Sequence, residues 1–413
     1  MKRLLPILIV LLLVFPSSLS LATSTVDNGD SFDDRSFDIK IRFLMRLNYL
    51  PSLIICIVKN NSIVYLKPYG FSNLYLRKKA SEDTVYISGS ISKVITATAL
   101  MQLYEKGFFD LDDCVSKYLP FELRNPRYPG VNITFRMLLS HQASINDFGL
   151  QPISVLPIMV SSRCSSDISN LTKEMLILGG KWYSDRYWLD HPPGDVAQYS
   201  NQGFVIAGYL VEKISGKSIE EYCREHIFKP LNMMNTSFYL DKVVKRRVAK
   251  PYTCVGGVFL PLPKYDFYFI DAAGGLFTTA EDLSHFLIAH MNAGSFEEER
   301  ILREETVNLM HTIQYPNSTD LVLSRFFGGD VEIHHGLGWQ IINFYGVRLV
   351  GHSGGAIGYN CHMLILRDDE NEKVGVILLS NGPLLLPAFL SLKYTAVGYK
   401  MLLEAILEKV NEL

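Results

Sequence analysis

The sequence predicts an antiparallel β-sheet covered by helices, with a helical domain inserted into it. Runs of β-branched and apolar residues occur near the start of the chain and again near its end, and short turns join successive runs. Short turns connect antiparallel strands, whereas a parallel sheet needs a long crossover after each strand. Helical patterns precede and follow these runs. The chain has 413 residues, of which 48% are hydrophobic, so it can bury a large core.

The N-terminus has the pattern of a targeting segment. Lys2 and Arg3 precede an apolar run at residues 4–15, and a proline and small residues follow it. This three-part order is typical of a secretory signal peptide, which we expect at residues 1–22. Residues 4–22 would alternatively be long enough for an uncleaved membrane anchor. Either reading predicts an extracytoplasmic protein, secreted or anchored at the outer face of the membrane.

The main folded domain is expected over residues 37–413, after a polar spacer at residues 23–36. An amphipathic helix is predicted from about Phe37, followed by two β-rich runs, SLIICIVKN and SIVYLKPYGFSN, which form a hairpin. The stretch from Ser90 to Gly107 then predicts a helix with one apolar face and a glycine at its end.

A helical subdomain is predicted at about residues 108–252, where the pattern becomes helical and rich in loops. Helices are expected at ITFRMLLSH, GFVIAGYLVEKI and SIEEYCREHIF, and after the insertion at AEDLSHFLIAHMNAG and EETVNLMHTI. Strands are expected at RLVGHSGG, CHMLILRDD and KVGVILLSN, and a last helix at about residues 392–410. These strands connect as hairpins, which again favours an antiparallel sheet.

Ser90 and Lys93 form a candidate nucleophile and base. Residues three apart share one face of a helix, so the amine of Lys93 can reach the hydroxyl of Ser90. The N-terminus of a helix favours a nascent alkoxide, and burial would lower the pKa of the lysine enough for it to act as a base. A Ser-x-x-Lys spacing also arises by chance in a chain of this length, so the motif alone does not establish catalysis.

Tyr199 and Asn201 lie in a loop directly before a predicted amphipathic helix. A phenol beside a lysine can lose its proton, and an asparagine amide can both donate to a carbonyl and accept from an ammonium. A second Tyr-x-Asn occurs at Tyr315, but only the first stands at such a loop-to-helix junction.

The third constellation surrounds His352. Gly354 and Gly355 would let a substrate lie along a strand edge, where the backbone N–H of Gly355 could join that of Ser90 as an oxyanion donor. The same residues also match the Gly-x-Ser-x-Gly nucleophile elbow, with Ser353 as the nucleophile. That alternative requires a helix directly after the serine, and then an acid and a histidine in that chain order. The residues after Ser353 are strand-like, and no histidine follows Asp368 and Asp369, because His362 is the last in the chain.

Together these ordered motifs resemble the serine β-lactamase and penicillin-recognising superfamily. The likeness is strongest to the branch of class C β-lactamases, D-aminopeptidases, DD-carboxypeptidases and related esterases. It extends over about residues 37–382, and includes the flanking segments MLLSH, IFKPLNMMNTSF, AAGGLFTTAEDL and GLGW. The resemblance implies a β-lactamase/transpeptidase-like α/β sandwich with an inserted helical domain, a site between the two parts, and no metal or other cofactor.

His352 is the informative departure from the class C pattern, where lysine stands. A mostly neutral imidazole, with an ordinary pKa near 6.5, anchors a substrate carboxylate weakly at pH 7 and more strongly toward pH 6. This favours a peptidase or esterase over a β-lactamase. In the acyl-transfer mechanism that the resemblance implies, Ser90 is the nucleophile, Lys93 and Tyr199 share general-base work, and Asn201, His352, Gly354 and Gly355 bind the substrate.

Composition excludes other classes of function. The net charge of −2 provides no basic field for nucleic acid, so we expect a small-molecule or peptide substrate instead. The six cysteines form no C-x-x-C pair, so they suggest neither a zinc ribbon nor a thioredoxin-like site, and they leave disulfides and free thiols equally open. A penicillin- or other ligand-binding protein with this fold but no turnover remains the alternative from a different functional class.

Overall fold

The structure is a computed structural model that describes residues 32–146, 165–267, 270–320, 323–324, 331–367, 372–382 and 392–413. Residues 40–413 form one compact unit, and the residues through Ile39 form another. The signal or anchor expected at residues 1–22 and most of the expected spacer lie outside the described residues. Within the described part, no helix is both long and apolar enough to span a bilayer.

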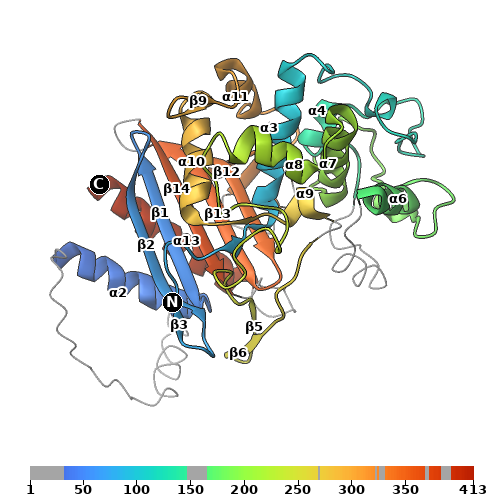
Figure 1. Ribbon diagram of the computed structural model, residues 1–413. Helices are drawn as coiled ribbons and strands as arrows, with labels where there is room; N and C mark the ends of the chain where they lie inside the picture. The colour runs from blue at the N-terminus through green and yellow to red at the C-terminus, as the bar shows by residue number, and fades with distance from the viewer. Residues whose placement is uncertain are drawn as a thin grey trace, which may run out of the picture. The chain divides into compact units, whose positions relative to one another are not determined.

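An antiparallel sheet organises the larger unit, as the sequence predicted (Figure 1). Each strand pairs with a neighbour of opposite direction. In spatial order the eight strands described are β10 (Val331–His335), β11 (Gln340–Phe344), β12 (Val347–Ala356), β13 (Tyr359–Arg367), β14 (Lys373–Asn381), β1 (Ser52–Lys59), β2 (Ser62–Asn73) and β3 (Lys78–Lys79). The β1–β2 hairpin therefore pairs with β14, so strands from the beginning and the end of the described sheet sequence lie next to each other.

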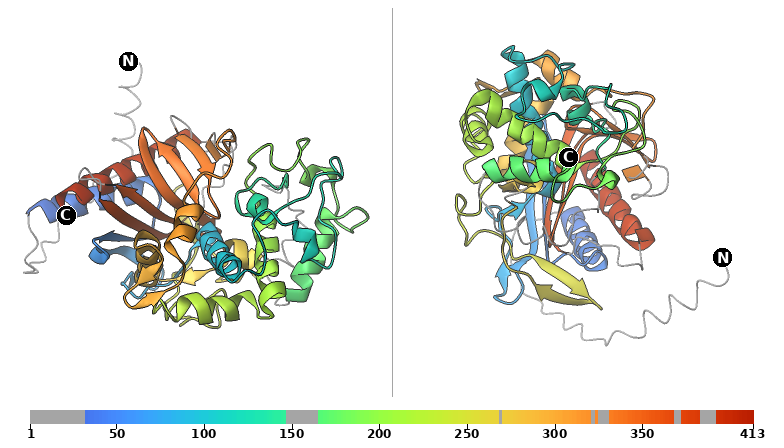
Figure 2. Two further views of the ribbon diagram at one scale, coloured as in Figure 1. Left: turned by 90° about the horizontal axis from the view of Figure 1, so that it is seen from above. Right: turned by 90° about the vertical axis from the view of Figure 1, so that its right-hand side faces the viewer.

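Helices cover both faces of this sheet (Figures 1 and 2). On one face, α10 (Ala280–Met291) packs against β1 and β14. On the other lie α13 (Leu392–Glu412) and the part of α2 (Phe32–Leu47) that begins at Lys40, whose side chain pairs with Glu408. In α13 the buried residues recur at helical spacing, as Leu402, Ala405, Ile406 and Val410.

A second, mainly helical part is built around α3 (Ser92–Glu105), which packs against α7 (Asn201–Ser215) and α9 (Asp271–Gly274). The remaining helical elements described are α4 (Phe135–Leu139), α6 (Ser165–Leu176), α8 (Ile219–Cys223), α11 (Glu304–Met310) and the short turns η1 (Gly89–Ile91), η2 (Val115–Lys117), η4 (Asp185–Tyr187) and η5 (Arg224–Phe228). Three small two-stranded antiparallel sheets complete the described structure. Two are hairpins, β5 (Tyr252–Val255) with β6 (Val258–Pro261) and β8 (Ser295–Phe296) with β9 (Glu299–Arg300), and the third pairs β4 (Tyr86–Ile87) with the distant β7 (Phe277–Thr278).

Local chemistry sets where the helices begin and end. The side chain of Thr134 accepts from Met137 N before α4, and that of Ser200 accepts from Gly203 N before α7. Gly107 has a φ of +75° after α3, which is the predicted glycine stop. Helix α2 begins at Phe32 rather than at about Phe37, because no glycine or proline interrupts the polar residues ahead of its apolar pattern. The expected spacer is therefore helical in its last residues.

The sequence did not predict strands β10 and β11. They are short, and β10 contains two histidines and a glutamate, so neither has a long β-branched run. Their pairing with each other and with β12 is what makes them strands. This extension of the sheet carries His335 toward the candidate site.

Candidate active site

Ser90 and Lys93 lie together, as their spacing predicted. Ser90 occupies the 3₁₀ turn η1 and is partly exposed, and Lys93 follows in the first turn of α3 and is fully buried. Lys93 Nζ is 3.1 Å from Ser90 Oγ, 2.9 Å from Asn201 Oδ1 and 2.6 Å from the carbonyl oxygen of Ala273. These contacts hold the nitrogen beside the serine hydroxyl from three directions, so the amine is positioned before any substrate binds.

Tyr199 and Asn201 reach the same place from the start of α7. Asn201 is the first residue of the helix, directly after its cap Ser200, and its side-chain oxygen accepts from Lys93. The ring centroid of Tyr199 is 4.8 Å from Lys93 Nζ, and the tyrosine side chain is buried. The loop-to-helix junction predicted from the sequence therefore brings both side chains to the lysine.

Strand β12 forms the opposite wall. A Cβ added at Gly354 would lie 1.9 Å from the carbonyl oxygen of Ser88, and one added at Gly89 would lie 2.7 Å from the nitrogen of Gly355. The strand and the turn before Ser90 thus touch backbone to backbone, which requires glycine at both positions. Gly355 is exposed, so its surroundings are open to a substrate.

His352 is buried on this strand, with its ring centroid 6.1 Å from that of Tyr199. Its Nδ1–H donates to the carbonyl oxygen of Ser353 at 2.6 Å. Burial and the charge of Lys93 lower the pKa of His352 to about 3. The expectation that His352 gains charge toward pH 6 is therefore wrong, because a buried imidazole next to a lysine does not keep an ordinary pKa.

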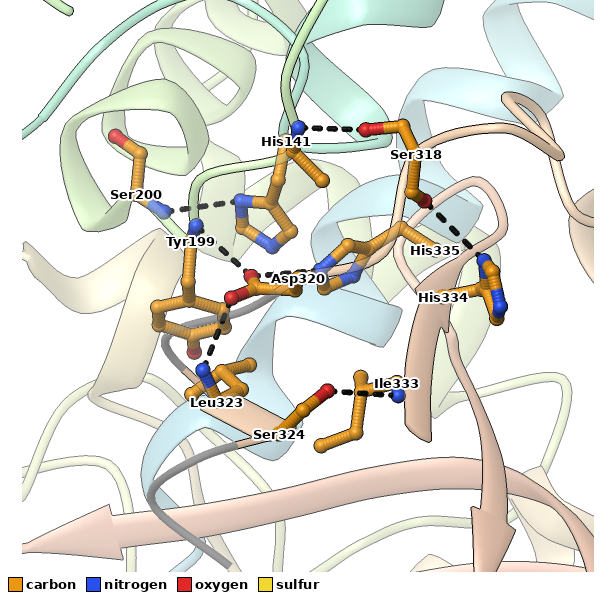
Figure 3. Close-up of polar contacts among 11 residues, drawn as sticks. His141, Tyr199, Ser200, Ser318, Asp320, Leu323, Ser324, Ile333, His334 and His335 are labelled. Carbon is orange, nitrogen blue, oxygen red and sulfur yellow. Dashed lines mark hydrogen bonds and ion pairs between the residues drawn. The ribbon is translucent and has the colours of Figure 1, made fainter. Parts of the chain in front are cut away.

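Behind Tyr199 lies a buried group that the sequence did not single out (Figure 3). Asp320 Oδ2 accepts from His335 Nε2 at 3.0 Å and from the backbone N–H of Tyr199 at 3.1 Å, while Oδ1 accepts from Leu323 N at 3.0 Å. The carboxylate is fully buried. It therefore ties strand β10 to the loop that carries Tyr199.

His141 completes this group. Its Nδ1 accepts from the backbone N–H of Ser200 at 3.0 Å, and its ring centroid lies 4.5 Å from that of Tyr199 and 4.6 Å from that of His335 (Figure 3). Burial, with His335, Lys93 and His352 nearby, lowers the pKa of His141 well below its usual value. The ring is therefore neutral and carries its proton on Nε2.

Two sequence signals could have drawn attention to this group. His141 ends MLLSH, one of the flanking segments that carry the family resemblance. His335 directly precedes GLGW. Asp320 had no such signal, because its link to Tyr199 spans 121 residues of the chain.

The nucleophile-elbow alternative is not supported by the local structure. Ser353 lies within strand β12, which leads by a turn into strand β13 and not into a helix. Its Oγ is 3.1 Å from Nδ1 of His362, its cross-strand neighbour. Ser353 is the next residue after His352 in the strand, so its side chain points to the opposite face of the sheet.

No metal site is found among the residues that the structure describes, since no three histidine, cysteine, aspartate or glutamate side chains in them cluster suitably. The five described cysteines, Cys56, Cys114, Cys223, Cys254 and Cys361, are free thiols. Cys164 lies outside the described residues.

Comparison with known proteins connects this geometry to a family. The model of the beta-lactamase family matches residues 41–394. Protein flp of Staphylococcus aureus (strain MW2) is 24% identical over 348 residues, which are 84% of this chain and 63% of that protein. Beta-lactamase-like protein 2 of Dictyostelium discoideum is 30% identical over 296 residues, which are 68% of this chain and 50% of that protein. The match thus spans less than two thirds of either relative.

Solved structures share the fold. The octameric penicillin-binding protein homologue from Pyrococcus abyssi has a TM-score of 0.67 at 28% identity, over 91% of this chain and 78% of that one. D-amino acid amidase from Ochrobactrum anthropi SV3 has a TM-score of 0.69 at 21% identity, over 92% and 99%. The hydrolase EstCE1 has a TM-score of 0.68 at 18% identity, over 91% and 100%. The chain belongs to the beta-lactamase family.

Proposed function

We propose that this protein is a serine hydrolase that cleaves an amide or ester through an acyl-enzyme, as a peptidase or esterase. The observation that carries the proposal is the position of Lys93 Nζ, which is buried and 3.1 Å from Ser90 Oγ. A serine hydroxyl is a weak nucleophile until a base takes its proton. Here a candidate base is held at hydrogen-bonding distance from a partly exposed serine.

The reaction begins when Ser90 Oγ attacks the carbonyl carbon and its proton passes to Lys93, with Tyr199 sharing the proton. The carbonyl oxygen becomes an oxyanion, which the N–H groups of Ser90 and Gly355 stabilise. The C–N or C–O bond then breaks as the base returns the proton to the leaving amine or alcohol. Water next attacks the acyl-enzyme and gives a proton to the same base, and Ser90 recovers its hydrogen as the acid is released.

Asn201 and His352 have different parts in this scheme. The Asn201 side-chain oxygen accepts from Lys93, and an asparagine amide can also donate, so Asn201 both positions the lysine and lies where it can orient the substrate carbonyl. His352 is neutral, so it supplies no fixed positive charge for a substrate carboxylate. The absence of that charge favours simple esters and amides over penicillins, whose carboxylate needs a cation.

The deciding experiment is intact-protein mass spectrometry after reaction with a fluorophosphonate. The unmodified protein and Ser353→Ala should each gain one adduct, with loss of fluoride, and Ser90→Ala should gain none. An adduct on Ser353 would contradict the proposal. Release kinetics of an acyl group from an activated ester then separate an enzyme from a binder, since an acyl group that never leaves would identify the ligand-binding alternative.

A further inference from the structure

The β5–β6 hairpin presents an apolar face to solvent. Val255 and Val258 pair across a two-residue turn, and their side chains are 62% and 61% exposed. Leu260 lies two residues along on the same face and is 44% exposed. The turn residues Gly256 and Gly257 both have positive φ, which suits a tight hairpin. Two valines at the tip of a hairpin therefore leave most of their apolar surface in solvent.

The opposite face of the hairpin fixes its position. The buried Tyr252 ring stacks on the Tyr75 ring with centroids 6.4 Å apart, and Phe259 meets Tyr252 edge-on at 6.2 Å. Tyr75 belongs to the turn between β2 and β3, where Tyr75 and Leu76 are themselves 66% and 76% exposed. Two neighbouring turns therefore each expose large apolar side chains, and Figure 1 shows β3, β5 and β6 side by side.

Basic residues surround these turns. Lys78 Nζ donates to the carbonyl oxygen of Arg246 at 2.6 Å, and Lys264 Nζ donates to the carbonyl oxygen of Lys245 at 2.7 Å. These two hydrogen bonds connect the segments around Lys78, Lys245 and Lys264. Residues 242–250 contain five basic residues and no acidic one, a concentration that the net charge of −2 conceals. Burial, followed by the charges of Lys78 and Lys250, lowers the pKa of Lys264. The exposed apolar side chains of the two turns and the basic residues beside them form what we call the basic apolar surface: Tyr75, Leu76, Arg77, Lys78, Lys79, Lys245, Arg246, Lys250, Val255, Val258, Leu260 and Lys264.

We propose that the basic apolar surface binds an anionic lipid bilayer. Aliphatic and aromatic side chains at turn tips can enter the boundary between headgroups and acyl chains, while lysine and arginine beside them pair with anionic headgroups. A second copy of the chain is a poor partner, because a symmetric contact would set these positive charges against each other. The phosphates of a nucleic acid would pair with the basic side chains, but they would leave Val255, Val258 and Leu260 exposed to water.

The test is co-sedimentation with phosphatidylcholine vesicles, with and without about one third phosphatidylserine. Binding should require phosphatidylserine and weaken as salt rises. Lys245→Glu with Arg246→Glu should weaken the partition at least tenfold, and Val255→Asp with Val258→Asp should weaken it comparably. Lys213→Glu with Lys229→Glu, exposed basic residues elsewhere, is the matched control and should change binding less than twofold. Thermal unfolding midpoints check that each variant is folded.

Three results would overturn the proposal. These are equal binding to vesicles with and without phosphatidylserine, unchanged binding in both surface variants, or an oligomer in sedimentation velocity that Val255→Asp with Val258→Asp dissociates. Tighter binding to a DNA duplex than to the anionic vesicles, lost in Lys245→Glu with Arg246→Glu, would assign the surface to nucleic acid instead. None of these measurements depends on hydrolytic activity, so the proposal stands or falls separately from the proposed function.

Discussion

Asp320 and His335 form a fully buried acid–imidazole pair, with Oδ2 and Nε2 3.0 Å apart, directly behind the loop that carries Tyr199. The same carboxylate oxygen accepts from the backbone N–H of Tyr199. A buried carboxylate is costly unless it is fully hydrogen-bonded, and here each oxygen has a donor. The pair therefore positions Tyr199 through its backbone N–H, while Lys93 lies next to the tyrosine ring.

Asp320→Asn tests this positioning role. The amide keeps the size of the side chain, but its N–H₂ group faces a backbone donor, so we expect a loss of stability of about 1–3 kcal/mol. Turnover number should fall about tenfold or more with a smaller change in KM, because displacement of Tyr199 affects chemistry more than binding. Urea unfolding and steady-state kinetics with an activated ester measure the two effects.

Asp195→Asn is the matched control, since Asp195 bonds to His191 at a similar distance but on the surface, where both side chains are 54% exposed. It should change stability by less than about 0.5 kcal/mol and leave kinetics unchanged. Wild-type kinetics in Asp320→Asn would remove it from the positioning role.

Ser90→Ala should abolish hydrolysis of an activated ester, with a loss of about a thousandfold or more in kcat/KM, because only the nucleophile is removed. Ser353→Ala should retain most activity, since its hydroxyl contacts His362 and not Lys93. The measurement is ester hydrolysis with circular dichroism as the check on folding. The reverse order of effects would assign the nucleophile to Ser353.

Lys93→Ala and Tyr199→Phe should each reduce the turnover number about a hundredfold or more if they share one proton. The double variant should lose far less than the product of the two losses, because groups that act as a unit are not additive. Substrate binding, measured as KM with a slow substrate, should change little. A single variant with near-normal turnover would exclude its residue from the base.

The neutral His352 predicts a flat pH profile for carboxylate recognition. Its folded pKa of about 3 lies below the unfolded value near 6.5, so the ring stays uncharged between pH 5 and pH 8. The ratio of KM values for matched substrates with and without a carboxylate should therefore stay constant over that range. A ratio that improves toward pH 6 would show that the ring is protonated there.

The depressed pKa of His352 also affects stability. The unfolded chain binds a proton at this histidine below pH 6.5 and the folded chain does not, so the contribution of His352 to stability falls as pH decreases from 6.5 toward 3. At pH 5 this loss is about 2 kcal/mol for the one group. His352→Gln should accordingly lose less stability than the parent between pH 7 and pH 5, as measured by urea unfolding.

Much of the fold could be predicted from local pattern. The hairpin of β1 and β2 and the glycine stop after α3 follow from residues close together in the chain. Strands β10 and β11 could not be predicted in this way, because pairing with β12 supplies most of what makes them strands. The start of α2 was missed because apolar periodicity marks a buried face and not the limit of helical hydrogen bonding.

The sequence by itself determined which reactive groups are available and in what order, since Ser90-x-x-Lys93, Tyr199-x-Asn201 and His352-x-Gly354 are local motifs with their chemistry in the side chains. Only the tertiary structure decided the protonation state of these groups and the hydrogen bonds that position them. The pKa of His352 depends on burial and on the charge of Lys93, which is far away in sequence. Asp320 meets Tyr199 and His335 only after the sheet and the helical part have packed together. Solvation and contact across long sequence separations are properties of the folded chain, so no local pattern contains them.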